Sequence, residues 1–503
     1  MCRLPSALLL LAALTLAGCF REVRPAPAPA PSEATFSRAA DELFASIEAE
    51  GAMASVLVVD AQTGAPLYAR REHGRSLPAS TMKVVSTAAA LSALGPDFRF
   101  RTPVQLSGAR QGELFEGELI VESSGDPSLG SWRFPETATT CDQIVDAMWG
   151  RGIRKWRGAL RVVSPDTGLD GPLGPGWAWD DVAYFMSAAP MPFVFRENSI
   201  DLTLMRAEGA PCSAQPTLHV APRFAPFSAV VQIDTEGSSS GFACLRDHNP
   251  SRTRCVWRST ARSCPRSTSH RLTVDDPGAL FSACLEDALT RRGIAHTSSP
   301  QVARESAPRS KAPVTELLTE LVSPSLAELV KVTNKESINL YAERLALRFA
   351  RERVGDEDYS ALRKAMNAEL TRRGIPSRDL RPIDGSGLSR YNLATARGLV
   401  QVLFTSLKEP YGQALLDSLP IAGMDGTLGG QPLSAETLAR VRAKTGTLSS
   451  QKAYIGVAER PHDPEHPRVI FSLMLGNMDE QPAISATGAF GKFTEALTQL
   501  PLR

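Results

Sequence analysis

A serine and a lysine one helical turn apart form the first candidate for catalysis. Ser80 and Lys83 lie in Pro78-Ala79-Ser80-Thr81-Met82-Lys83, which small and apolar residues continue to Leu91. Residues at this spacing share one face of a helix. A serine hydroxyl becomes a nucleophile when a base takes its proton, and a lysine can be that base if desolvation or nearby cations keep it neutral. The pair predicts serine catalysis, although S-x-x-K alone also fits a first-turn serine beside a solvated lysine.

Two later stretches carry further reactive side chains. Ser337 and Asn339 stand two residues apart at the entrance of a predicted helix, where Ser337 taken alone would be an N-cap. The run Lys444-Thr445-Gly446-Thr447 precedes a predicted strand that starts at Ala453. A glycine in such a place lets a substrate backbone approach a strand edge closely. Each stretch is weak evidence when it is taken alone.

Taken in order, S-x-x-K, S-x-N and K-T-G match the motif set of the penicillin-recognising serine acyltransferases. Because Ser80 and Ser337 are unusually far apart, the chain resembles the peptidase S13 family, the D-alanyl-D-alanine carboxypeptidases/endopeptidases of the penicillin-binding protein 4 type. The resemblance runs from about Phe36 to the C-terminus. Supporting segments are Gly125-Asp126-Pro127-Ser128-Leu129, Gly176-Trp177-Ala178-Trp179-Asp180-Asp181, Asp384-Gly385-Ser386-Gly387-Leu388-Ser389-Arg390 and Ala422-Gly423-Met424-Asp425-Gly426-Thr427-Leu428.

The resemblance implies a role for each motif residue. Ser80 would attack the carbonyl of the penultimate D-alanine, and Lys83 would accept its proton. Ser337 would relay a proton to the leaving amine, while Asn339 would bond the substrate and orient Lys83. Lys444 would supply the positive potential that keeps Lys83 deprotonated. Thr445, Gly446 and Thr447 would bind substrate, with the threonines on its carboxylate and the N–H groups of Ser80 and Thr447 forming an oxyanion hole.

The implied function is a serine D-Ala-D-Ala carboxypeptidase and D,D-endopeptidase that acts on peptidoglycan stem peptides and is acylated by β-lactams. No cofactor or metal is expected, because the sequence has no H-E-x-x-H or C-x-x-C pattern and His462 and His466 are predicted to lie in a hairpin loop among prolines. Two alternatives stay open. One is a β-lactamase or esterase on the same fold, and the other is a non-catalytic, membrane-tethered peptidoglycan-binding protein.

The elements that must position these motifs occupy the two ends of the chain. A predicted hairpin (54–60 and 66–69) precedes the serine helix, and helices, two strands and a last helix follow from 325 onwards. The predicted fold class is α/β (α+β), a penicillin-binding-protein/β-lactamase-like transpeptidase domain with an antiparallel sheet flanked by helices. This D,D-peptidase domain is expected at 36–99 and 310–503, split by a β-rich insertion at 100–309.

The first residues predict export. Arg3 and the apolar run Ala7–Leu16 read as a signal peptide over residues 1–18. Leu16-Ala17-Gly18-Cys19 resembles the lipobox of bacterial lipoproteins, so Cys19 is the expected lipidation site, followed by a proline- and alanine-rich tether to residue 35. We therefore expect a periplasmic, membrane-anchored lipoprotein, sorted to the outer membrane where the cell has two membranes. A plain secretory signal is the alternative.

The net charge and the cysteines narrow the possible classes of protein further. The formal net charge of the 503-residue chain is only +1, so nothing points to nucleic acid. Apart from Cys2 and Cys19, all cysteines lie in the central region (Cys141, Cys212, Cys244, Cys255, Cys264 and Cys284). An even number in an oxidising compartment predicts disulfides, and the pairing stays open.

Overall fold

The computed structural model describes residues 35–164, 173–236, 239–246, 253–260, 262–296, 303–305, 315–479 and 484–502. The predicted signal peptide, Cys19 and nearly all of the tether lie outside these residues. No helix in the described part of the chain is long and apolar enough to cross a membrane.

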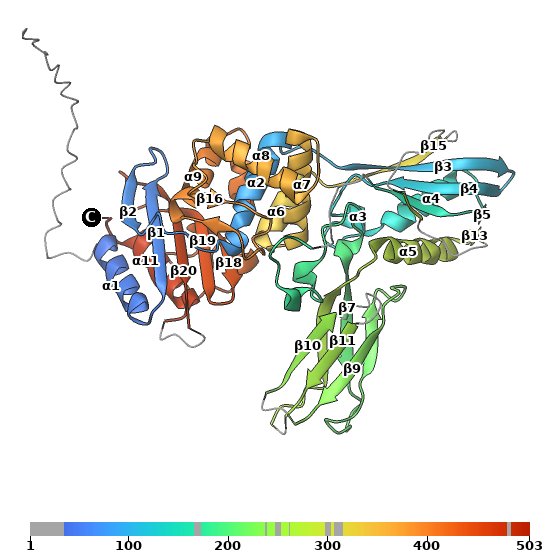
Figure 1. Cartoon of the computed structure of the whole chain (residues 1–503), viewed down its shortest axis with the longest axis horizontal. Coiled ribbons are helices and arrows are strands. Elements are labelled where there is room, and N and C mark those ends of the chain that lie inside the picture. Colours follow the sequence, from blue (N-terminus) through green and yellow to red (C-terminus); the bar gives the residue numbers. More distant parts are fainter. Residues whose placement is uncertain are drawn as a thin grey trace, which may run out of the picture.

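A five-stranded antiparallel sheet joins the two ends of the chain, in the order β18-β19-β20-β1-β2 (Figure 1). Three of its strands are buried along almost their whole length because helices cover both faces, which explains their nearly continuous apolar sequences. The predicted hairpin is confirmed: Asp60 Oδ1 accepts from the N–H groups of Gln62 and Thr63 in its turn. The strands are β1 (Met53–Asp60), β2 (Pro66–Arg70), β18 (Val441–Leu448), β19 (Gln451–Glu459) and β20 (Arg468–Gly476).

The loop 460–467, which contains His462 and His466, connects β19 to β20 as predicted. His466 Nδ1 lies 3.0 Å from Asp60 Oδ2, so this histidine ties the hairpin to the end of β1. The described residues contain no cluster of three or more His, Cys, Asp and Glu side chains that could hold a metal ion.

Helices cover the two faces of the sheet, and several begin at side chains that satisfy free N–H groups. Ser325, Asp358, Thr395 and Ser485 each accept a hydrogen bond from the backbone of the following turn. One face carries α1 (Phe36–Ala49) and α11 (Ala486–Gln499). The other carries α2 (Met82–Leu94), α6 (Leu326–Lys335), α7 (Asn339–Val354), α8 (Tyr359–Arg372), α9 (Ala396–Leu407) and α10 (Gly412–Ser418).

The insertion has its own hydrophobic core, built around Trp156, Trp257 and Phe281. In Figure 1 it extends away from the helices as two lobes. One lobe contains β3 (Arg101–Gln111), β4 (Leu114–Glu122), β5 (Lys155–Arg157), β6 (Leu160–Val163), β13 (Ala295–His296), β14 (Ala303–Glu305) and β15 (Thr315–Val322), with α3 (Pro135–Ala138), α4 (Thr140–Gly150) and α5 (Pro277–Arg292). The other contains β7 (Ser199–Met205), β8 (Thr217–Ala221), β9 (Ala229–Asp234), β10 (Gly241–Arg246), β11 (Thr253–Arg258) and β12 (Ser267–Thr273).

The strand pairing carries the insertion past its expected limit at residue 309. Strand β15 pairs antiparallel with β3, with Val322 opposite Arg101, so the inserted sheet closes only at Val322. The sequence of β15 alone does not show whether this strand belongs to the insertion or to the peptidase domain, because only its pairing with β3 decides this. We use "insertion" below for residues 101–322.

All six cysteines of the insertion are paired, as Cys141–Cys284, Cys212–Cys264 and Cys244–Cys255. The first pair joins α4 to α5, and the third joins directly opposed residues of β10 and β11. The prediction of disulfides is confirmed, and the structure supplies the pairing that the sequence left open.

Candidate active site

Ser80 lies in a short 3-10 turn, η1 (Ala79–Thr81), and the α-helix α2 starts only at Met82. Ala79 has a φ of +47°, and Thr81 Oγ1 donates to Pro78 O at 2.6 Å, which together fix the turn. Gly387 packs directly on this turn, since a Cβ at that residue would lie 1.8 Å from Ala79 O. The backbone next to Ser80 is therefore supported by a contact with residue 387 that only a glycine allows.

Lys83 is the centre of the site. Its side chain is fully buried in α2, and Nζ donates to Ser80 Oγ at 2.8 Å, to Asn339 Oδ1 at 2.5 Å and to Ser386 O at 2.8 Å. Burial lowers the pKa of Lys83 to about 7, against the opposing effect of the Asp384 and Glu343 carboxylates. The amine is thus in contact with the Ser80 hydroxyl and is partly neutral at physiological pH.

Ser337 occupies the turn between α6 and α7 in a left-handed conformation, with a φ of +59°. It does not cap α7, whose N-cap is Ile338; instead its hydroxyl accepts from Lys444 Nζ at 3.0 Å. Asn339 begins α7 and donates through Nδ2 to Met186 O at 2.7 Å, so its Oδ1 faces Lys83. The two residues point toward different lysines.

Strand β18 is an edge strand of the sheet and brings the third motif to the Ser80 turn. A Cβ on Gly446 would lie 2.7 Å from Pro78 O and 3.0 Å from Ser80 N, so the glycine permits this close approach. Lys444 is fully buried, Thr445 donates to Thr427 Oγ1 at 2.8 Å and Thr447 is exposed. The strand therefore passes from a buried cation to an exposed hydroxyl beside the candidate nucleophile.

The two buried lysines affect each other through their charges. Burial and then the charge of Lys83 lower the pKa of Lys444 well below its ordinary range. Because this repulsion is mutual, Lys444 also disfavours the charged form of Lys83, whose pKa is lowered to about 7 by burial. The structure thus brings together all five predicted catalytic residues, and it adds burial to the expected effect of Lys444 on the base.

The sequence interpretation missed Glu343, a buried carboxylate that lies beside Asp384 beneath the site. Glu343 accepts from Ser386 N at 2.7 Å and from Gly385 N at 3.1 Å, and so holds the loop whose Ser386 carbonyl binds Lys83. Burial and the Asp384 carboxylate raise the pKa of Glu343 above its usual range. The available signal was its position four residues after Asn339, on the same helix face.

Asp384 forms the core of the same loop. Its carboxylate accepts from Gly387 N at 2.9 Å, Ser389 N at 2.6 Å and Asn392 Nδ2 at 2.7 Å. Trp177 of the insertion donates to it from Nε1 at 3.0 Å. The loop that supports both Ser80 and Lys83 is therefore organised around two buried carboxylates, those of Asp384 and Glu343.

Comparison with known proteins agrees with this geometry. The D-Ala-D-Ala carboxypeptidase 3 (S13) family matches residues 37–496. A D-alanyl-D-alanine carboxypeptidase of Actinomadura sp. is 31% identical over 427 residues, covering 82% of this chain and 76% of that protein. The D-alanyl-D-alanine carboxypeptidase DacB of Haemophilus influenzae is 27% identical over 74% of this chain and 75% of its own length.

The fold is also known from solved structures. The crystal structure of penicillin binding protein 4 from Haemophilus influenzae matches with a TM-score of 0.76 at 23% identity, covering 91% of this chain and 98% of that chain. The predicted α+β fold of the penicillin-binding-protein type is confirmed by this match. Both the length of the family match and the identity to the Actinomadura protein place the chain in one family: it belongs to the D-Ala-D-Ala carboxypeptidase 3 (S13) family and is a serine-type D-Ala-D-Ala carboxypeptidase.

Proposed function

We propose that this enzyme cleaves peptidoglycan stem peptides through an acyl-enzyme on Ser80, with Lys83 as the general base. The observation that carries the proposal is the 2.8 Å contact between Lys83 Nζ and Ser80 Oγ in a site that lowers the pKa of the amine to about 7. A neutral amine at that distance accepts the hydroxyl proton as Oγ attacks the carbonyl carbon of the penultimate D-alanine. Such base assistance is worth about 10² to 10⁴ in rate.

Collapse of the tetrahedral intermediate then breaks the bond between the acyl carbon and the nitrogen of the terminal D-alanine. The proton that Lys83 took from Ser80 passes through the Ser337 hydroxyl to this nitrogen, which leaves Lys83 neutral again, and the contact with Lys444 Nζ holds Ser337 in place for the transfer. Water next attacks the Ser80 ester and gives a proton to the neutral Lys83. Lys83 then passes this proton to Ser80 Oγ as the ester bond breaks, so that the free acid and Ser80 are regenerated. The positively charged form of Lys444 and the Thr445 and Thr447 hydroxyls bind the carboxylate of the departing residue.

The backbone N–H groups of Ser80 and Thr447 form the oxyanion hole in this proposal. Gly446 supports it, because the absence of a Cβ lets β18 approach Ser80 N. Loss of one such donor costs about 10² to 10³ in rate in other serine hydrolases. The edge position of β18 also allows an extended peptide to pair along the strand.

The proposal is tested on the purified protein with a fluorescent penicillin and with a muropeptide that ends in D-Ala-D-Ala. We expect release of D-alanine and stable penicillin labelling, with the adduct mapped by mass spectrometry to the peptide that contains Ser80. Rapid turnover of penicillin without D-alanine release would instead identify a β-lactamase. An adduct elsewhere, or none, would contradict the assignment of Ser80.

We also propose that the exported enzyme is held at a membrane through a lipid on Cys19. The sequence Leu16-Ala17-Gly18-Cys19 supports this, as does the pairing of all six cysteines of the insertion, which leaves none of them to bind Cys19. Disulfides are typical of an oxidising compartment such as the periplasm. Several acyl chains on one residue are enough for stable anchoring.

Replacing Cys19 tests the anchor. In the native host, Cys19→Ser is expected to move the protein from the membrane fraction to the supernatant after cell breakage, and to abolish incorporation of labelled fatty acid. Cys2→Ser is the matched control, because Cys2 lies in the predicted signal peptide, and it should leave both measurements unchanged. Retention of Cys19→Ser in the membrane would rule out lipid anchoring at this residue.

A further inference from the structure

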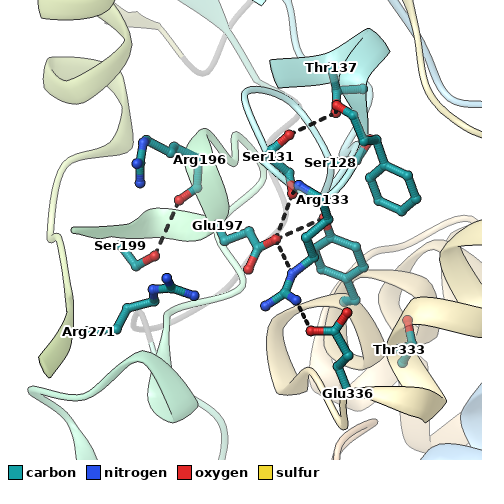
Figure 2. A network of polar contacts seen from close by, with 12 residues as sticks. Ser128, Ser131, Arg133, Thr137, Arg196, Glu197, Ser199, Arg271, Thr333 and Glu336 are labelled. Atoms are coloured by element: carbon teal, nitrogen blue, oxygen red, sulfur yellow. Dashed lines mark hydrogen bonds and ion pairs between the residues drawn. The ribbon is translucent and has the colours of Figure 1, made fainter. Parts of the chain in front are cut away.

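The insertion touches the Ser337–Asn339 turn through a buried polar network. Figure 2 shows Arg133 between the carboxylates of Glu197 and Glu336. Its Nε donates to Glu197 Oε1 at 2.7 Å, and its Nη1 donates to Glu336 Oε2. Glu197 and Arg133 belong to the insertion, whereas Glu336 directly precedes Ser337. One guanidinium therefore links the two parts of the chain next to the candidate proton relay.

Glu197 is an unusual anchor, because it is fully buried and is held by a strained backbone. Arg196, Glu197 and Asn198 all have positive φ values, of 51°, 54° and 48°. Non-glycine residues adopt this conformation at a cost, and they keep it only where the surroundings fix it. Here Arg196 N donates to Leu129 O, and Asn198 Oδ1 accepts from Phe195 N. The loop is built to direct one carboxylate inward.

The carboxylate of Glu197 collects further donors from both sides of the interface. Ser131 Oγ donates to Oε1 at 2.7 Å, and Tyr341 OH donates to the same oxygen at 3.2 Å. Tyr341 is fully buried on α7, two residues after Asn339. Glu197 thus reaches the active-site turn twice, through Arg133 before Ser337 and through Tyr341 behind Asn339.

The turn itself needs such support. Ser337 has a left-handed backbone, and Lys335, two residues before it, is paired with Asp425 Oδ2 at 2.5 Å. The Met186 carbonyl of the insertion accepts from Asn339 Nδ2. Lys335 and Glu336, which precede Ser337, and the amide of Asn339 are therefore held by residues from outside the turn. Two of these three contacts come from the insertion.

We propose that Arg133 and Glu197 are positioning residues for the Ser337–Asn339 turn, so that the insertion sets the alignment of the proton relay and of the amide that orients Lys83. This inference rests on the proposed function for its kinetic consequence. Neither residue touches the reacting atoms. Loosening the network would displace Ser337 and Asn339, and couplings of this kind change activity by about 2- to 30-fold.

Glu336→Gln is the first test, because it removes only the charge of the outer contact and the Glu336 side chain is 49% exposed, so folding is not at stake. Arg133→Met removes the link entirely but leaves Glu197 buried without its cation, and Arg133→Lys keeps the charge. Arg373→Met is the matched control: Arg373 is a similarly buried arginine paired with Glu369 at 2.8 Å, away from this turn.

Two measurements are made on the purified proteins: penicillin acylation with the kcat and KM for muropeptide, and hydrogen exchange of the amides at 336–342. We expect Glu336→Gln and Arg133→Met to lower acylation and kcat at nearly unchanged KM and to speed exchange in the turn, with partial rescue by Arg133→Lys. Arg373→Met should change neither. The proposal would be overturned if both network variants had the same hydrogen-exchange and acylation rates as Arg373→Met.

The hydrogen-exchange measurement tests this inference separately from the proposed reaction. Faster exchange in the turn of an enzyme that does not release D-alanine would support the positioning role and refute the peptidase assignment. Unchanged exchange in variants of an active peptidase would refute the positioning role and leave the peptidase assignment supported.

Discussion

Lys83→Met is expected to lower the rates of penicillin acylation and D-alanine release by about 10² to 10⁴, the range typical of a lost general base. Methionine has a similar length and avoids burying an amine, so the fold should survive. The measurement is the second-order rate constant for labelling by a fluorescent penicillin, with thermal unfolding as the check on folding.

Lys83→Arg separates a base from a simple positive charge. An arginine keeps the cation but cannot be deprotonated in a protein. If Lys83 acts as the base, the arginine variant is as inactive as the methionine variant. Retention of most of the acylation rate by Lys83→Arg would show that the residue contributes only its charge, and the mechanism proposed above would be wrong.

The pH dependence gives an independent check on the same residue. The reactive form of Lys83 is the neutral amine, and its pKa in the folded protein is about 7. Acylation should therefore rise as pH increases through about 7 and level off above it. A rate that stays constant from the acidic side through neutrality would contradict Lys83 as the titrating base.

The sequence was enough to predict which side chains meet at the candidate site, because their types and spacing carry the pattern. The spacing of Ser80 and Lys83 predicted that the two side chains meet, although Ser80 lies in the turn η1 before α2. Lys444 was expected before a strand and instead lies within the strand β18. The sheet strands β1, β19 and β20 were also predictable, since burial on both faces leaves continuous apolar runs. Their joining into one sheet follows from the motif order, which requires both chain ends to meet.

The residues that hold the candidate catalytic side chains in place were not predictable in the same way. Asn339 is oriented by the backbone carbonyl of Met186, and a carbonyl contact leaves no mark in the sequence. Glu343 looks like an ordinary glutamate on a helix, and only its tertiary position reveals that it holds the loop at Ser386. The left-handed backbone of Ser337 likewise depends on contacts with residues far away in the chain.

A single methyl group beneath the nucleophile should show how closely these supports are fitted. Gly387 has a φ of +87°, and a Cβ there would lie 1.8 Å from Ala79 O and 3.1 Å from Met82 Cβ. Gly387→Ala must therefore push the Ala79 carbonyl away and move Ser80 with it. Displacements of about 1 Å in a catalytic group cost about 10² in rate, which is the loss of acylation that we expect.

The control is Gly374→Ala, because Gly374 has a similar φ of +71° but no atom within 4 Å of the added Cβ. It carries the same backbone strain, of roughly 1 to 2 kcal/mol, without the collision. We expect equal or smaller destabilisation and a wild-type rate of penicillin acylation in this variant. A rate in Gly387→Ala that matches the control would show that the Ser80 turn tolerates movement. In that case the placement of Ser80 would not depend on Gly387, and the nucleophile would be aligned mainly through Lys83 and β18.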